Sequence, residues 1–341
     1  MKKAISYMAC SMAAMLALSA CGSAASSAST VASSSDAAST ESTAASEASN
    51  EPVTITFAQY SGSGDNEQYL QQMVDNYMKE NPNVTIDLQT YGYDDYFTQM
   101  TAKVSGGQAP DVFELDYQNF VSYAKKGALM PLDDILTKDG IDTSIYNDMA
   151  LKAFSADGVQ YGVPDSFSNV VLIYNKDLFE SGRLGMIVTG IWAFPEYTSN
   201  CDFDWDIVVE PGHTQKATHF FSNGYVVSKD SQVADEAVKF ITYISSNREA
   251  TQIRLDAGWE LPPVQDEDII AQYKEKTPPA NREAVFKSLD YLVTPPVITQ
   301  YAELQDIVGQ HLSAAAAGTV TPEQALKDMQ AECEQKIDLT K

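Results

Sequence analysis

The chain has 341 residues, of which 22 are basic and 47 acidic, and its formal net charge is −25. This excess of acidic side chains disfavours nucleic acid as a partner, because phosphate binding needs clustered Lys and Arg. The length allows a substantial hydrophobic core and favours two lobes over one.

The first residues predict an exported protein with a lipid anchor. A basic start, Met1-Lys2-Lys3, precedes an apolar stretch that is short for a membrane span and ends in small residues. The sequence Leu-Ser-Ala-Cys-Gly at 18–22 resembles the lipobox of bacterial lipoproteins, in which Cys21 becomes the lipidated first residue. We expect residues 1–20 to be a signal peptide and the mature chain to lie outside the cytoplasm, anchored to the outer face of the bacterial cytoplasmic membrane. The alternative is a transmembrane helix.

Residues 21–50 are almost entirely Ser, Ala and Thr, and they contain no aromatic residue. Such a segment buries too little apolar surface to offset its ordering entropy, so we expect a flexible tether behind the lipidated cysteine. The mature domain then retains Cys201 and Cys333. Their pairing stays open, because sequence separation does not define disulfide geometry.

Strands and helices alternate at the start of the folded part. The apolar spacing predicts strands over residues 53–57, 84–88 and 111–115. Each is followed by a predicted helix, over about 66–80, 94–105 and 118–126. This order with short loops predicts a parallel sheet covered by helices. Ligands of such sheets collect beyond the carboxyl ends of the strands, here the segments 59–67 and 116–119.

Beyond Gly158 the pattern changes to scattered extended segments and a helical C-terminal part. Extended segments are predicted at 160–164, 170–174, 206–210 and 225–228. Helices are predicted over 234–245, 248–255, 281–291, 298–316 and 322–336. The fold class that follows is α/β.

A series of short strings runs through the chain from residue 53 to its end. They include Ala-Pro-Asp-Val-Phe at 109–113, Lys-Gly-Ala-Leu at 126–129, Tyr-Gly-Val-Pro at 161–164, Tyr-Asn-Lys-Asp-Leu-Phe at 174–179, Ser-Gly-Arg-Leu-Gly-Met at 181–186, Gly-Ile-Trp at 190–192 and Thr-Pro-Glu-Gln-Ala-Leu at 321–326. In this order they resemble the extracellular solute-binding proteins of bacterial ABC importers, specifically the carbohydrate-binding group related to maltose-binding protein. The resemblance implies a two-lobed, periplasmic-binding-protein-like architecture of type II.

The chain departs from that family at one place. In the family, several helices and strands separate the string at 174–179 from the glycine-rich string that begins at 181, whereas here the two are contiguous. We therefore expect a shortened second lobe. The first lobe is expected over residues 51–174 plus about 217–275, and the reduced second lobe over 175–216 plus about 276–341.

Candidate ligand-binding residues follow the first and third predicted strands. Sugar recognition needs flat apolar rings for the pyranose face and polar groups for the hydroxyls. Tyr60 and Asp65 lie in or beside a polar glycine-rich loop, and Asp116 and Tyr117 occupy the equivalent position after the third strand. Each aromatic residue could instead pack into the core at its strand end.

Three further aromatic residues complete the predicted site. Trp192 resembles the cleft tryptophan of the family, although a lone Trp after a strand usually lies in the core. Trp259 lies between Gly258 and a Pro-Pro pair, and Tyr225 follows Asn-Gly. Glycine and proline predict a loop at Trp259, where a large aromatic ring needs a partner.

No motif of an enzyme, cofactor or metal site stands out. Asp202, Asp204 and Asp206 imitate the first half of a calcium loop, but Ile207 and His213 stand where that loop needs glycine and glutamate. The sequence also lacks GxSxG, HExxH and P-loop motifs. We therefore expect no catalytic residues, no cofactor and no metal.

The leading hypothesis is a lipid-anchored, monomeric receptor that closes two lobes around a sugar or oligosaccharide and delivers it to the permease subunits of an ABC importer. The alternatives are a surface glycoside hydrolase, a binding protein for a peptide, polyamine or iron chelate, and a truncated variant with impaired binding.

Overall fold

The computed structural model describes residues 51–62, 64–175, 183, 185–294 and 297–338. The predicted signal peptide, the lipid attachment at Cys21, the tether and the junction at 179–181 lie outside these residues. Within the described ranges, no helix has the length and apolar character that a membrane crossing requires.

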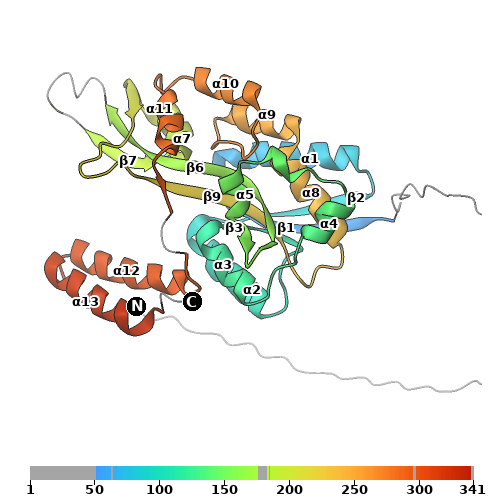
Figure 1. Cartoon of the computed structure of the whole chain (residues 1–341), viewed down its shortest axis with the longest axis horizontal. Coiled ribbons are helices and arrows are strands. Elements are labelled where there is room, and N and C mark those ends of the chain that lie inside the picture. Colours follow the sequence, from blue (N-terminus) through green and yellow to red (C-terminus); the bar gives the residue numbers. More distant parts are fainter. Residues whose placement is uncertain (1–50, 63, 176–182, 184, 295–296, 339–341) are drawn as a thin grey trace, which may run out of the picture. The chain divides into compact units, whose positions relative to one another are not determined.

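An eight-stranded mixed sheet forms the centre of the fold (Figure 1). Its main path runs β2 (Val84–Thr90), β1 (Val53–Gln59), β3 (Val112–Asp116), β9 (Thr218–Val227), β6 (Gly162–Asn175) and β7 (Met186–Gly190). Strands β8 (Trp205–Val208) and β10 (Leu292–Val293) pair with β6 and β9 off this path, and β4 (Ser155–Ala156) and β5 (Val159–Gln160) form a small separate sheet. The strands β2, β1 and β3 are parallel, whereas β9 is antiparallel to β3 and β6.

The alternation of side chains along β1 explains how helices cover both faces of this part of the sheet. Ile55 and Phe57 pack into a core with α1 (Glu67–Glu80) and α8 (Ala234–Ser246). Ala58 points to the opposite face, where it packs with α2 (Tyr93–Ser105) and α3 (Tyr117–Lys125). Successive side chains of a strand point to opposite faces of the sheet. Because helices cover both faces here, the strand is buried on each of them.

Strand β6 belongs to two parts of the sheet. Its first half pairs with β9, with a register irregularity between Pro164 and Ser166, and its second half pairs with β7 and β8. Val171 and Ile173 in that second half pack in one apolar cluster with residues of α7 (Phe194–Asn200) and α11 (Glu283–Leu289). The residues predicted as two extended segments, 160–164 and 170–174, therefore mostly fall in one long strand, because β9 and then β7 supply continuous pairing.

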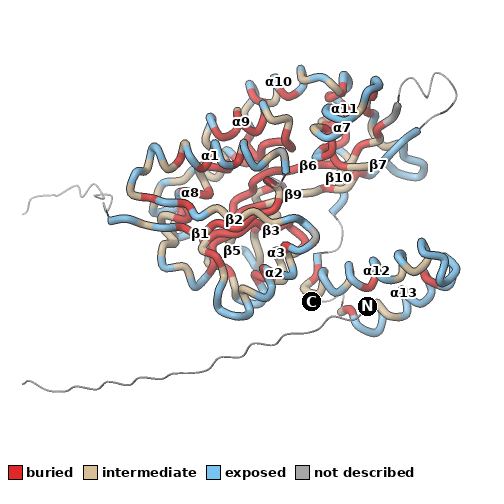
Figure 2. Tube along the Cα trace, turned by 180° about the vertical axis from the view of Figure 1, so that it is seen from behind, coloured by how far each residue is buried: buried red, intermediate tan, exposed pale blue. Residues whose placement is uncertain are grey.

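The remaining helices are α4 (Asp133–Lys138), α5 (Asp148–Lys152), α9 (Arg248–Ala257), α10 (Glu267–Glu275), α12 (Tyr301–Ala316) and α13 (Pro322–Lys336). The pair α12–α13 has a small apolar cluster of its own, built on Ile298, Ile307 and Ile337. Figure 2 shows the middle strands of the sheet as buried and both of these helices as largely exposed. Cys201 and Cys333 are free thiols.

Candidate functional site

The carboxyl end of β1 places Tyr60 behind a group of aromatic residues on α2. The Tyr60 ring is only 6% exposed, and its hydroxyl donates a 2.8 Å hydrogen bond to Asn223 Oδ1. Its centroid lies 5.4 Å from those of Tyr93 and Phe97. Tyr60 therefore supports these rings from within the core. Asp65 follows in a short 3-10 turn at Gly64–Asn66.

The carboxyl end of β3 places Asp116 at the start of α3. Asp116 Oδ1 accepts a 2.7 Å hydrogen bond from the backbone N–H of Asn119, so this side chain caps the helix. Burial raises the pKa of Asp116, and the hydrogen bonds from Asn119 oppose that rise. Tyr117 is buried, with its hydroxyl 3.4 Å from His219 Nε2. The sequence correctly placed both residues at a strand end.

A cavity of about 840 Å³ lies between α2, α3 and α12, and its lining extends to the segments just before β3 and just after β9. The predicted site residues Tyr60, Asp65, Asp116 and Tyr117 are not among the residues that line it. Aromatic side chains and polar groups share its lining, which includes Tyr93, Phe97, Thr101, Asn119, Tyr123, Lys126, Lys229, Tyr301, Gln305 and Asp306. Its volume is within the usual range for small-molecule sites.

Tyr301 comes from the distant helix α12, but it lies close to the predicted site. Burial raises the pKa of Tyr301 to about 12, and the nearby charge of Asp116 adds to the rise. Burial also raises the pKa of Tyr117, and Tyr301 and Asp116 add to that rise. Sequence reasoning missed Tyr301 because helical periodicity does not say which element a helix approaches. It also missed Tyr93 and Phe97, although the cluster of aromatic residues at 91–97 was a usable signal.

Trp192 is exposed but does not line this cavity. Its indole lies across the backbone of Gly190, where an added Cβ would come within 1.8 Å of the ring. The ring also packs edge to face on Phe221, with centroids 4.9 Å apart. With 41% of its surface exposed, Trp192 lies in the 3-10 turn Ile191–Ala193 that follows β7, whereas Tyr301 lies on α12.

Tyr225 and Trp259 lie together in the core and away from solvent. The exposed fractions are 1% for Tyr225 and 3% for Trp259. Both contact Arg254, which donates a 3.1 Å hydrogen bond to the Tyr225 hydroxyl and forms a buried ion pair with Asp165. Their role in ligand binding stays a prediction, and their burial offers no ring face to a ligand.

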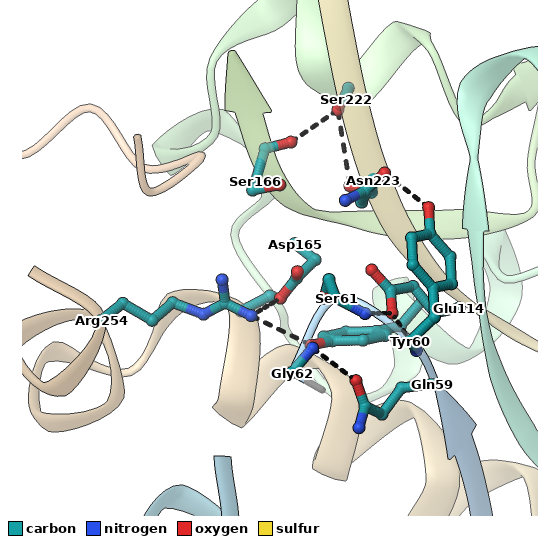
Figure 3. Close-up of polar contacts among 12 residues, drawn as sticks. Gln59, Tyr60, Ser61, Gly62, Glu114, Asp165, Ser166, Ser222, Asn223 and Arg254 are labelled. Carbon is teal, nitrogen blue, oxygen red and sulfur yellow. Dashed lines mark hydrogen bonds and ion pairs between the residues drawn. The ribbon is translucent and has the colours of Figure 1, made fainter. Parts of the chain in front are cut away.

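A buried polar network lies directly beneath the loop that follows β1 (Figure 3). Glu114 Oε2 accepts hydrogen bonds from the backbone N–H groups of Tyr60, at 2.9 Å, and Ser61, at 3.0 Å. The N–H of Gly62 donates a 2.7 Å bond to Gln59 Oε1. Burial, with a smaller contribution from Asp165, raises the pKa of Glu114 to about 8. The loop is thus held by side chains from inside the domain.

The geometry defines a class of protein. A ligand-sized cavity with aromatic and polar walls lies between α2, α3 and α12. In the described part of the chain, no group of three or more His, Cys, Asp or Glu residues is arranged to hold a metal ion. A cavity of this size and lining is typical of a protein that binds a small molecule.

Comparison with known proteins agrees with this class. Two family models, both described as bacterial extracellular solute-binding protein, match residues 61–181 and 176–278. An ABC substrate-binding protein of Listeria monocytogenes, solved in complex with cycloalternan, is 33% identical, with a TM-score of 0.78 over 84% of this chain and 99% of that one. The chain belongs to the family of bacterial extracellular solute-binding proteins, and its fold is the two-lobed α/β fold of type II binding proteins.

Curated relatives match shorter segments. A putative binding protein of Brucella abortus is 27% identical over 132 residues, which are 39% of this chain and 31% of that protein. The maltotriose-binding protein of Pyrococcus abyssi is 28% identical over 111 residues, 33% of this chain and 24% of that protein. The chain thus spans about a third of the length of the first curated relatives that it matches.

Proposed function

We propose that this protein binds a sugar or oligosaccharide and delivers it to an ABC importer. The observation that carries the proposal is the cavity between α2, α3 and α12, in which Tyr93, Phe97 and Tyr301 share the wall with polar side chains. The names of several relatives, such as maltotriose-binding protein and diacetylchitobiose-binding protein, agree with a carbohydrate ligand.

The chemistry of the lining suits a carbohydrate. A pyranose ring has apolar C–H faces that stack on aromatic rings, and hydroxyls that need hydrogen-bond donors and acceptors. The side-chain amides of Asn119 and Gln305 supply both hydrogen-bond donors and hydrogen-bond acceptors at this cavity, and Lys126 and Asp306 supply charged groups. The mixture of acidic and basic groups favours a neutral polar ligand over a polyamine or an anion.

Release and capture would follow from movement about the strands that join the two parts of the sheet. β6 continues from its pairing with β9 into its pairing with β7 and β8, so a change of twist near Pro164 would move one part relative to the other. The proposed lobes are residues 51–174 plus about 217–275, and 175–216 plus about 276–341. No bond is made or broken in this function.

The proposal includes the lipid anchor at Cys21 and a monomeric receptor at the outer face of the cytoplasmic membrane. It also includes a shortened second lobe, because the string at 174–179 meets the string at 181–186 without the intervening elements of the family. These features are proposals from the sequence, since Cys21 and the junction at 179–181 lie outside the described ranges.

The test is a thermal-shift screen of the full chain against maltotriose, diacetylchitobiose and a panel of monosaccharides, with a reducing-sugar assay in parallel. A ligand at about 100 times its dissociation constant adds about 2.7 kcal/mol to the free energy of unfolding. We expect stabilisation by at least one saccharide and no release of reducing ends. Release of reducing ends would support the glycoside hydrolase instead, and stabilisation by no saccharide would contradict the sugar receptor.

A further inference from the structure

Asn119 lines the cavity of the candidate site, and its side-chain amide is held against Asp116. Asn119 Nδ2 lies 3.1 Å from Oδ1 and 2.9 Å from Oδ2 of that carboxylate. The backbone N–H of Asn119 donates a further hydrogen bond, of 2.7 Å, to Asp116 Oδ1. Asp116 is the N-cap of α3 and Asn119 lies in its first turn, so the start of the helix brings the two side chains together.

The chemistry of the two groups determines which end of the amide faces Asp116. A carboxylate only accepts hydrogen bonds, whereas an Asn amide has a donating nitrogen and an accepting oxygen. The nitrogen therefore points to Asp116, and the hydrogen bonds it donates favour the ionised carboxyl. An amide turned by 180° would place its oxygen against two carboxylate oxygens. Because Asp116 is only 6% exposed, water would do little to relieve that contact.

The oxygen of the Asn119 amide is left for the cavity. Asp116 does not line the cavity, and within the part of the chain that the structure describes nothing donates a hydrogen bond to Asn119 Oδ1. The other polar groups of the wall are less constrained. Thr101 Oγ1 and the Tyr123 hydroxyl lie 3.0 Å apart, and either can be the donor. No hydrogen bond among the described residues fixes the amide of Gln305 on α12.

We propose that Asp116 is a positioning residue that makes Asn119 present a hydrogen-bond acceptor to the ligand, so that the site selects a saccharide with a hydroxyl donor at this position. The value of this selection rests on the proposed function, whereas the orientation of the amide does not depend on any ligand. A carboxylate or phosphate group has no proton to donate here, and the charge of Asp116 behind the amide repels it. The site therefore favours a neutral saccharide over a uronate or a sugar phosphate.

Asp116→Asn reverses the hydrogen-bond polarity at Asn119 and keeps the helix cap. Asn caps helices about as well as Asp, so the oxygen of the substituted side chain still accepts the backbone N–H of Asn119. The NH2 group of that side chain then faces the Asn119 amide, which has to turn and accept with Oδ1. Asn119 Nδ2 is thereby directed to the cavity. Asp266→Asn is the matched control, because Asp266 caps α10, which has nine residues like α3, and does not line the cavity.

The first measurement follows hydrogen exchange of the Asn119 side-chain NH2 protons by NMR, in the full chain without ligand. In the wild type and in Asp266→Asn, we expect the proton bonded to Asp116 to exchange about tenfold or more slowly than in Asp116→Asn. Equal exchange in Asp116→Asn and the wild type would overturn the proposal. Should Asp116→Asn fail to fold, the wild type alone carries the test, and an Asn119 amide that exchanges as fast as a free Asn side chain would overturn it.

The second measurement compares the saccharide that gives the largest thermal shift with analogues in which fluorine replaces one hydroxyl at a time. Fluorine donates no hydrogen bond, so we expect an analogue that loses about tenfold in affinity for the wild type, the effect of one hydrogen bond, and clearly less for Asp116→Asn. Asp266→Asn should repeat the losses of the wild type. If every analogue lost as much in Asp116→Asn as in the wild type, the proposal would be contradicted.

A double-mutant cycle separates positioning from a general structural role of Asp116. Asp116→Asn should change the loss for that analogue while Asn119 is present, and should have no effect once Asn119→Ala has removed the amide. An equal change in both backgrounds would show that Asp116 acts by another route. Because the exchange measurement uses no ligand, it still reports the orientation of Asn119 when no saccharide binds, so a failure of the proposed function is distinguished from a failure of this inference.

Discussion

The guanidinium of Arg254 lies 4.2 Å from the centre of the Trp259 ring, and both side chains are buried. A cation over an indole face is favourable, and it is more so when both groups are out of water. Trp259 thus covers one face of the arginine that neutralises Asp165. This arrangement gives a tryptophan in a Gly/Pro-rich segment a structural partner inside the domain.

Trp259→Ala should therefore lower the stability of the protein. Removing a buried Trp costs about 3–5 kcal/mol through lost burial and the cavity that remains. Here the change also leaves one face of Arg254 uncovered. Urea unfolding of the full chain, followed by circular dichroism, measures the loss. An unchanged unfolding midpoint would show that the ring is exposed in solution and would restore Trp259 as a ligand-binding candidate.

Trp192→Ala should behave differently, because 41% of this side chain is exposed. We expect a smaller loss of stability than for Trp259→Ala, because less surface is taken out of burial. If Trp192 binds sugar, affinity in calorimetry falls in a protein that still unfolds cooperatively. Gly190→Ala is the partner experiment, because its methyl group displaces the indole without removing it. Unchanged affinity in both variants would exclude Trp192 from the site.

The stability of the domain should decline as the pH rises from about 4.5 to about 8. Burial raises the pKa of Glu114 to about 8 and that of Glu260 to about 7, so the folded protein keeps protons that the unfolded chain releases. The free energy of unfolding is then highest below pH 4.5 as far as these two groups are concerned, and it falls through this window. Urea unfolding at several pH values measures this slope, and Glu114→Gln should reduce it. An unchanged slope in this variant would contradict the raised pKa of Glu114.

Gly62→Ala should disturb the loop after β1. A Cβ at this position would lie 2.8 Å from Leu70 Cδ2 and 3.0 Å from Gln59 Oε1, so both side chains must shift. We expect a loss of about 1–3 kcal/mol in urea unfolding, as for overpacking elsewhere. Gly309→Ala is the control, and we expect it to raise the free energy of unfolding, because open space surrounds this helical glycine and alanine is the better helix former. If Gly62→Ala left the free energy of unfolding unchanged, the loop would be loosely packed in solution.

The sequence predicted the strands and long helices of residues 53–126, because their apolar spacing matches their burial. Helix α1 and strands β1, β2 and β3 lie within a few residues of their predicted bounds. The helices α4, α5, α7 and α10 were not predicted, since three of them are shorter than eight residues and none has a long apolar repeat.

The candidate site was only partly predictable. Strand-end reasoning placed Asp116 and Tyr60 at the ends of β3 and β1, but neither residue lines the cavity, and their role in ligand binding stays a prediction. Tyr301 could not be found that way, since its proximity to Asp116 depends on the tertiary placement of α12. For Tyr225, the sequence predicted neither Arg254 nor Asp165 as a neighbour, although these residues determine its buried surroundings.

The most direct test of the sugar-receptor account is a crystal structure of the full chain grown with the saccharide that gives the largest thermal shift. The account predicts sugar density in the cavity between α2, α3 and α12, with a pyranose face on Tyr93, Phe97 or Tyr301 and hydroxyls near Asn119. A saccharide bound elsewhere, with this cavity holding only water, would contradict it.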